Sequence, residues 1–98
     1  MDDWIKVRDK VWRKPFARDE KRGIQMDLMR IEPDFNDTPH WHSDWEWVYI
    51  LEGSLVDDKG IHKKGDFLLN DKDARHQPKS KEGCKMIIVW SGGVRQKP

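Results

Sequence analysis

The sequence predicts an all-β protein, a sandwich or a barrel, and three observations lead to this prediction. Short segments of alternating or continuously apolar character, rich in β-branched and aromatic residues, recur along the chain. Turn-forming Gly, Pro, Asn and Asp residues separate these segments, and none of them shows convincing helical periodicity. The chain is only 36% hydrophobic, but its six tryptophans supply large buriable surfaces, which favours a folded protein over a disordered one.

The first two predicted elements differ in clarity. Residues 2–12 fit a helical turn or two almost as well as a strand, so the sequence leaves this segment open. The next element is a predicted strand, because Ile24, Met26 and Leu28 recur at spacing two before Pro33 interrupts the pattern.

The second half of the chain predicts further strands. Residues 46–56 form a buried strand that is apolar on both faces. The turn sequence "DDKG" at 57–60 predicts a hairpin after it. Residues 65–70 and 85–90 are two more short strands, and 92–98 is an expected frayed tail.

Length and charge limit the organisation and the partners. The 98 residues predict a single domain over 1–98, with a short N-terminal arm at 1–22 and a core so small that a homodimer is expected. The 19 Lys and Arg against 18 Asp and Glu leave a net charge of +1, which favours neither nucleic acid nor a membrane surface. A single cysteine, no secretory signal and no apolar run of membrane length predict a soluble, cytoplasmic protein.

Three histidines and a glutamate are the candidate metal ligands. His40 and His42 are two apart, so on a strand both imidazoles point to one face and can share an ion. Glu46 opens the next strand and could act as a ligand and as a proton acceptor, and His76 is available as a fourth ligand. An isolated H-x-H is more often two packed or titrating side chains, but the combined N/O set suits a divalent transition ion.

The spacing H-x-H-x3-E-x6-G, in which Gly53 is expected to serve a turn, resembles the first motif of the cupin superfamily. Residues 40–84 are similar to the ChrR-type cupin subgroup, in which "LEG", a hairpin ending in glycine, "GD" and a histidine before S-x-x-G-C recur in this order. The resemblance extends from about Trp12 to Ser91. It implies a cupin double-stranded β-helix, a small jelly-roll barrel with an ion near one open end, whose implied ligands are His40, His42, Glu46 and His76.

This sequence departs from the cupin motifs at turns and not at ligands. Asp34 stands where the first motif has its leading glycine. In the second motif, Asp71 and Asp73 replace a proline and a glycine, and Ser80 replaces an asparagine. Because aspartate adopts turn conformations readily, the turns remain compatible with the fold.

Aromatic residues surround the predicted ligands. Trp41 and Trp45 could form the wall of a substrate pocket or pack under a loop. If the parity of the strand holds from Glu46, then Trp47, Tyr49 and Leu51 face outward. These three predict either a dimer surface or a face covered by the N-terminal segment with its tryptophans.

The remaining candidates favour structural roles. His62, in the predicted hairpin, is expected at the surface. Cys84 is expected to be a small buried residue and not a nucleophile, because the sequence places no base beside it. A solvated face is expected for Lys63, Lys64, Lys79 and Lys81.

Two functions follow from the resemblance. One is a metal-binding cupin that acts as a mononuclear metal-dependent dioxygenase on a small diketone or a hydroxyaryl-ketone-like molecule. The alternative is a non-catalytic zinc or small-molecule sensor, similar to the cupin domain of an anti-sigma factor. The cofactor expected for this ligand set is one divalent transition-metal ion, and Fe, Zn, Ni, Mn or Co would fit.

Overall fold

The computed structural model describes the following parts of the chain: residues 4–37, 40–42, 45–71, 75–91 and 94–96. For residues 40–42, 75–76 and 94–96 this description extends to the backbone only. The described residues form strands and turns, and none of them belongs to a helix long and apolar enough to cross a membrane. The predicted all-β class is therefore confirmed.

Strands occupy most of the described chain. In order they are β1 (Ile5–Arg8), β2 (Val11–Asp19), β3 (Ile24–Ile31), β4 (Phe35–Asn36), β5 (His40–His42), β6 (Glu46–Asp57), β7 (Gly60–Lys63), β8 (Phe67–Asn70), β9 (Arg75–His76), β10 (Lys79–Ser80), β11 (Cys84–Ser91) and β12 (Val94–Gln96).

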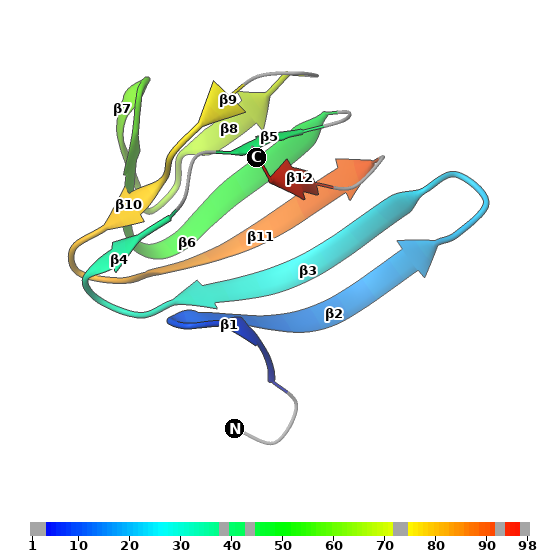
Figure 1. The fold of residues 1–98 in the computed structure, drawn as a ribbon, viewed down its shortest axis with the longest axis horizontal. Helices are drawn as coiled ribbons and strands as arrows, with labels where there is room; N and C mark the ends of the chain where they lie inside the picture. Colours follow the sequence, from blue (N-terminus) through cyan, green and yellow to red (C-terminus); the bar gives the residue numbers. More distant parts are fainter. Residues whose placement is uncertain (1–3, 38–39, 43–44, 72–74, 92–93, 97–98) are drawn as a thin grey trace.

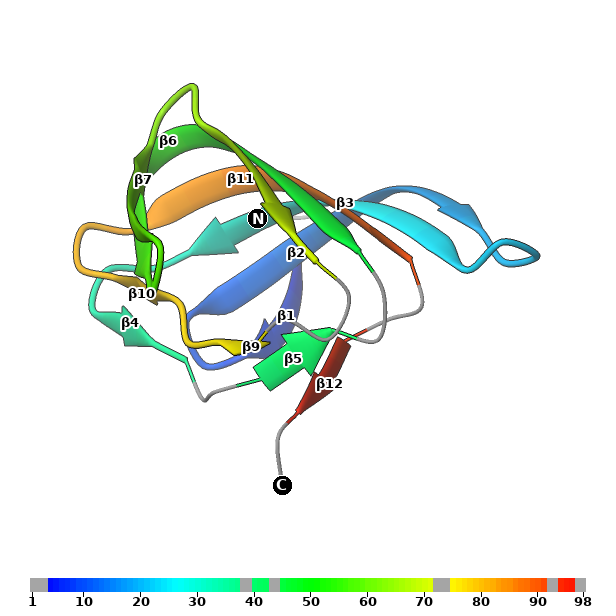
Figure 2. The same ribbon diagram turned by 90° about the horizontal axis from the view of Figure 1, so that it is seen from above.

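These strands form two antiparallel sheets. The larger sheet has nine strands, with the order β1-β2-β3-β11-β6-β10-β4 and with β7 and β8 also paired to β6. The smaller sheet has the order β12-β5-β9. The larger sheet curls strongly along its length, and the smaller sheet lies across the interior from it, so that together they form a half-barrel (Figures 1 and 2).

Strand parity decides which side chains fill this half-barrel. Along β6, Glu46, Val48 and Ile50 are buried, whereas Tyr49 is exposed, so the predicted alternation is confirmed. Ile50 is 0% exposed, and burial of such a side chain stabilises the fold by roughly 1.5–3 kcal/mol. The core consists of Val11, Met29, Ile31, Phe35, Val48, Ile50, Leu55, Cys84, Met86 and Ile88.

The N-terminal segment that the sequence left open forms strands. β2 pairs with β3 along its length, and β1 pairs with β2 at the edge of the larger sheet. The guanidinium of Arg30 lies 5.9 Å from the ring centroid of Trp4 and 5.6 Å from that of Trp12, and the Trp12 indole donates to Glu32 at 2.7 Å. These two tryptophans therefore stack on Arg30, and they leave Tyr49 40% exposed. The prediction that the N-terminal segment covers the outer face of β6 is therefore wrong.

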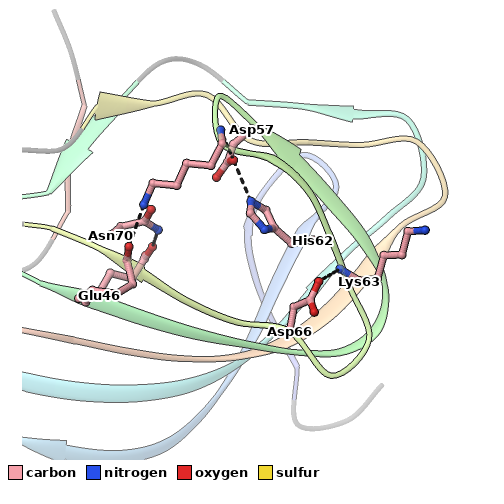
Figure 3. Close-up of polar contacts among 8 residues, drawn as sticks. Glu46, Asp57, His62, Lys63, Asp66 and Asn70 are labelled. Atoms are coloured by element: carbon pink, nitrogen blue, oxygen red, sulfur yellow. Dashed lines mark hydrogen bonds and ion pairs between the residues drawn. The ribbon is translucent and has the colours of Figure 1, made fainter.

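The predicted hairpin is present between β6 and β7, where Asp57 pairs with Gly60. His62 differs from the expectation of a surface histidine. Its side chain is only 12% exposed, and its Nε2 lies 2.8 Å from Oδ1 of Asp57, whose side chain is 2% exposed (Figure 3). The expectation was wrong because the hairpin register turns His62 toward a buried acceptor.

The four lysines expected on a solvated face are all exposed: Lys63, Lys64, Lys79 and Lys81.

Gly53 serves a close crossing of two backbones and not the turn expected from the sequence. It lies inside β6, just after a bulge at Leu51, which is skipped in the pairing with β11. Its φ is +74°, and a Cβ built there would lie 2.1 Å from the carbonyl oxygen of Gly83. Asp34, at the position of the motif's leading glycine, also has a left-handed φ of +63°, as expected for an aspartate that replaces glycine at a turn.

We expect Gly53→Ala to destabilise the protein by roughly 3 kcal/mol or more. The new Cβ would force the Gly83 carbonyl to move, and an alanine would also be strained at the positive φ of this position. Gly65→Ala is the matched control, since Gly65 also has a positive φ (+91°) but open space around its Cβ position. Its cost is expected at roughly 1–2 kcal/mol. Urea unfolding of both variants measures the difference, and equal losses would contradict the role of the close approach.

Candidate metal centre

The small sheet brings two of the predicted ligands to facing positions. β5 is its central strand, and in the pairing of β5 with β9 the backbone position of His40 is opposite that of His76. On the other side of β5, His42 is opposite Val94 of β12. Directly opposite residues of an antiparallel pair have Cα atoms about 4.5–5.5 Å apart. Residues at positions 40 and 76, far apart in the sequence, are thus neighbours in the fold.

Glu46 is the predicted ligand whose side chain the structure describes. It begins β6, is 4% exposed, and its Oε1 accepts a hydrogen bond of 2.7 Å from Nδ2 of Asn70 (Figure 3). Asn70 lies opposite Glu46 in the pairing of β6 with β8, which explains why the two side chains meet.

Burial controls the charge of this carboxyl. Loss of solvent raises the pKa of Glu46 from its ordinary 4.5 to about 7, and the hydrogen bond from Asn70 opposes this rise only in part. Near neutral pH, Glu46 can therefore hold or accept a proton. A buried carboxylate is also a place where a cation is favourable, because the cation compensates the lost hydration.

An apolar cavity of about 480 Å³ lies beside Glu46 and Asn70. This is within the usual range of small-molecule sites. The face of β3 that lines it carries Met29 and Ile31. The sequence alone did not say which of the two faces of this strand points inward. Its further apolar lining comes from Ile5, Val7, Val11, Phe35, Val48, Leu55, Pro78, Met86, Ile88 and Trp90.

Sequence reasoning missed several of these residues. The alternation of Ile5 and Val7 was a signal for a strand, but its place beside the cavity became clear only with the pairing of β1 to β2. Two arginines of the cavity wall, Arg8 and Arg13, were also missed. In a chain with 38% charged residues, nothing local distinguishes them from surface arginines.

The other predicted site residues have separate outcomes. Trp45 is 46% exposed and packs edge-on against Trp47, with ring centroids 5.7 Å apart. Its role as a pocket wall stays a prediction, and the side chain of Trp41 lies outside the described residues. Cys84 is buried as expected, and burial raises the pKa of its thiol to about 12, so it is unreactive.

The predicted ligand set remains incompletely described. Among the side chains that the structure describes, no three His, Cys, Asp or Glu groups gather in a metal-binding arrangement. The side chains of His40, His42 and His76 lie outside that part of the chain. The ligand set therefore stays a prediction.

The curled antiparallel sheet, which carries the apolar core and cavity on its inner side, and the small sheet that lies across the interior define a small jelly-roll barrel. Within that class the chain belongs to the ChrR cupin-like family, since the model of the ChrR cupin-like domain matches residues 2–95. The resemblance found in the sequence is thus confirmed. None of the curated proteins matches the chain in sequence.

Solved structures share the fold at low sequence identity. An RmlC-like cupin from Ralstonia eutropha has a TM-score of 0.88 and 19% identity over 97% of this chain and 66% of its own. An acetylacetone dioxygenase from Acinetobacter johnsonii has a TM-score of 0.89 and 6% identity, over 99% of this chain and 73% of its own. The anti-sigma factor ChrR, in complex with SigE of Rhodobacter sphaeroides, has a TM-score of 0.79 and 18% identity, over 88% of this chain and 48% of the matched chain. The chain thus spans just under two thirds of the Ralstonia protein and about half of the ChrR match.

The raised pKa of Glu46 predicts that the metal-free protein loses stability as pH rises. The unfolded carboxyl ionises near its ordinary pKa of 4.5 and the folded one near 7, so the folded state keeps the proton longer. Stability from this group is fully present below about pH 4.5 and is lost by about pH 7, a change on the order of 3 kcal/mol. Urea unfolding of chelator-treated wild type and Glu46→Gln between these pH values measures it. A loss in the wild type no larger than in the variant would contradict the assignment.

Proposed function

We propose that this protein is a metal-binding cupin in which His40, His42, Glu46 and His76 hold one divalent transition-metal ion. The observation that carries the proposal is the backbone register that sets position 40 opposite position 76. Side chains at directly opposite positions of an antiparallel pair share a face and lie close together. His42 shares the face of His40 by the period of a strand.

The chemistry of Glu46 supports the same site. A carboxyl that is 4% exposed, with a pKa raised to about 7, gains a favourable partner when a cation binds. Imidazole nitrogens with one carboxylate oxygen suit Fe, Zn, Ni, Mn or Co, and their choice depends on supply as well as affinity.

The catalytic form of this proposal is a dioxygenase that acts on a small diketone or a hydroxyaryl-ketone-like molecule. A bound ion with open coordination positions would polarise a carbonyl and bind O₂. The chain's own residues would do the rest. The apolar cavity of about 480 Å³ holds the substrate and excludes water, and Glu46 accepts a proton from an acidic carbon. The fold shared with the Acinetobacter acetylacetone dioxygenase supports this reading.

The second candidate is a non-catalytic sensor that binds zinc or a small molecule. It is favoured by membership of the ChrR cupin-like family and by the fold shared with the anti-sigma factor ChrR. A closed four-ligand zinc site would leave no open position for chemistry. The single cysteine, which has no internal disulfide partner, fits a cytoplasmic location for either candidate.

We also propose that two copies pair through the outer face of the larger sheet. Tyr49 and Phe67 are directly opposite each other on β6 and β8 and are 40% and 65% exposed. Trp47 and Leu69 form the next pair along the same face. These side chains form an exposed apolar patch, and aromatic residues are enriched in the central part of protein–protein interfaces. A second copy brings an identical apolar face, which suits a twofold dimer.

Metal content tests the ligand set. We expect near-stoichiometric metal in wild-type protein purified without chelators, and its loss in the His40→Ala/His42→Ala double variant, measured by element-resolved mass spectrometry. His76→Ala should lose metal, whereas His62→Ala, a histidine held by Asp57, should keep it. Equal retention in His76→Ala and His62→Ala would remove His76 from the site.

The identity of the metal separates the two candidates. Iron, manganese, nickel or cobalt together with O₂ consumption on addition of small diketones or hydroxyaryl ketones would support the dioxygenase. Stoichiometric zinc without O₂ consumption, also after replacement by iron, would support the sensor.

The dimer predicts a change of mass after one substitution. Phe67→Lys places a charge on the outer face of β8 and should convert a dimer to a monomer in light scattering coupled to size exclusion. Ile61→Lys is the matched control, because Ile61 is 62% exposed on β7, outside the Tyr49–Phe67 pairing. A wild-type monomer at all concentrations, or equal dissociation by both variants, would contradict this interface.

A further inference from the structure

Two arginines line the cavity, and their charges are used differently. Arg8 donates a hydrogen bond of 2.8 Å to Oδ2 of Asp37, whose side chain is 4% exposed. It also lies 5.9 Å from the ring centroid of Phe35. The charge of Arg8 is therefore largely engaged within the protein, at the more open part of the cavity wall.

Arg13 is engaged much less. Its side chain is 27% exposed, and its Nη1 is 3.6 Å from Oδ2 of Asp27, which is an ion-pair distance but longer than a hydrogen bond. Oδ2 of Asp27 takes its short hydrogen bond, 2.6 Å, from Nε2 of Gln25 instead. Within the described residues, Arg13 thus has a charge partner but no hydrogen-bond acceptor.

The ion pair with Asp27 fixes the position of the Arg13 side chain. The Asp27 side chain is 0% exposed, so its charge requires a nearby cation, and Arg13 on the adjacent strand supplies it. The alternation of β2 and β3 puts both residues on the inner side of the sheet. Oδ1 of Asp27 has no hydrogen-bond partner among the described residues.

A guanidinium that has a charge partner but no hydrogen-bond acceptor is suited to bind a carboxylate. It has five N–H donors in a planar fork that matches two carboxylate oxygens, and such hydrogen bonds are strong where water is limited. Most of the surrounding wall is apolar, and Met29, Val48, Ile88 and Trp90 of this wall lie on β3, β11 and β6, the strands that lead from the strand of Arg13 to that of Glu46. A ligand with a carboxylate at one end and an apolar body therefore fits the lining.

The separation of the two polar ends sets the size of the ligand. In the sheet, β2 and β6 are separated by β3 and β11. At about 4.8 Å per strand this is about 14 Å along the sheet, and the curl shortens the path through the cavity. A ligand that reaches from Arg13 toward Glu46 must contain several carbon atoms between its two ends.

We propose that Arg13, positioned by Asp27, recognises the carboxylate of a small apolar carboxylic acid, such as an aryl-substituted or medium-chain oxo acid. The acid group lies at Arg13 and the apolar body fills the cavity toward Glu46. The identity of the reacting end rests on the proposed metal function, whereas the binding of the carboxylate does not require the metal. Asp27 is a positioning residue, because it acts through Arg13.

Calorimetric titration of the full chain tests the proposal, with and without metal. The probes are phenylacetate, 3-phenylpropanoate and 4-phenylbutanoate, each compared with its neutral amide at pH 7.5. In wild type we expect at least one acid to bind about tenfold or more tighter than its amide. Arg13→Gln should abolish this preference, and Arg22→Gln, the control, should keep it, because Arg22 lies outside the cavity lining and pairs with Asp19 at the surface.

A second variant protects the test against misfolding, because Arg13→Gln alone leaves the buried Asp27 without its cation. Arg13→Gln/Asp27→Asn removes both charges, and near-UV circular dichroism reports whether it is folded. A folded double variant without the acid preference supports the proposal. No acid preference in the wild type, its survival in the double variant, or its loss in Arg22→Gln would overturn it. Failure of the metal proposal would be seen separately, as absence of metal from a wild type that still prefers the acid.

Discussion

The close approach of β6 to Gly83 is the constraint on which the rest of the structure depends. β6 pairs with β11 and β8 in its first part and with β7 and β10 in its second, so one strand holds most of the barrel together. This dual pairing requires the strand to bend, and the bend is possible because Leu51 bulges and Gly53 has no side chain to meet the Gly83 carbonyl. The direction of the first part then fixes where Glu46 enters the interior.

Two of the buried carboxyls in the barrel, those of Asp27 and Glu46, are stabilised by opposite means. Asp27 lies near a guanidinium and accepts a short hydrogen bond from Gln25. Glu46 accepts a hydrogen bond from a neutral amide and has a raised pKa, so it can lose its charge near neutral pH. β11 lies between their strands and contributes Met86, Ile88 and Trp90 to the cavity wall, so an apolar lining separates the two carboxyls. An anionic ligand group is proposed at one end of this cavity and proton or metal chemistry at the other.

Local pattern was enough to predict the strands, the hairpin and the inward face of β6, because alternation and turn residues act over a few positions. The cupin motif was enough to predict the family and a ligand set. Sequence could not give the pairing of position 40 with position 76 or the use of β1 as a cavity wall, because both depend on contacts between distant segments. His62 was misjudged for a related reason, since its acceptor lies across the hairpin. Sequence reasoning did not single out Arg13, because its partner, Asp27, lies on the neighbouring strand.

The attachment of β1 has a consequence for access to the interior. β1 is the terminal strand of the larger sheet and, among the described strands, pairs with β2 alone, yet Ile5 and Val7 line the cavity. An edge strand with one neighbour has a low free energy of local opening compared with the strands inside the sheet. Trp4 counteracts this by stacking on Arg30. This edge of the wall is thus held by a cation and an indole ring, and its local opening would expose the cavity without breaking the pairing of β2 with β3.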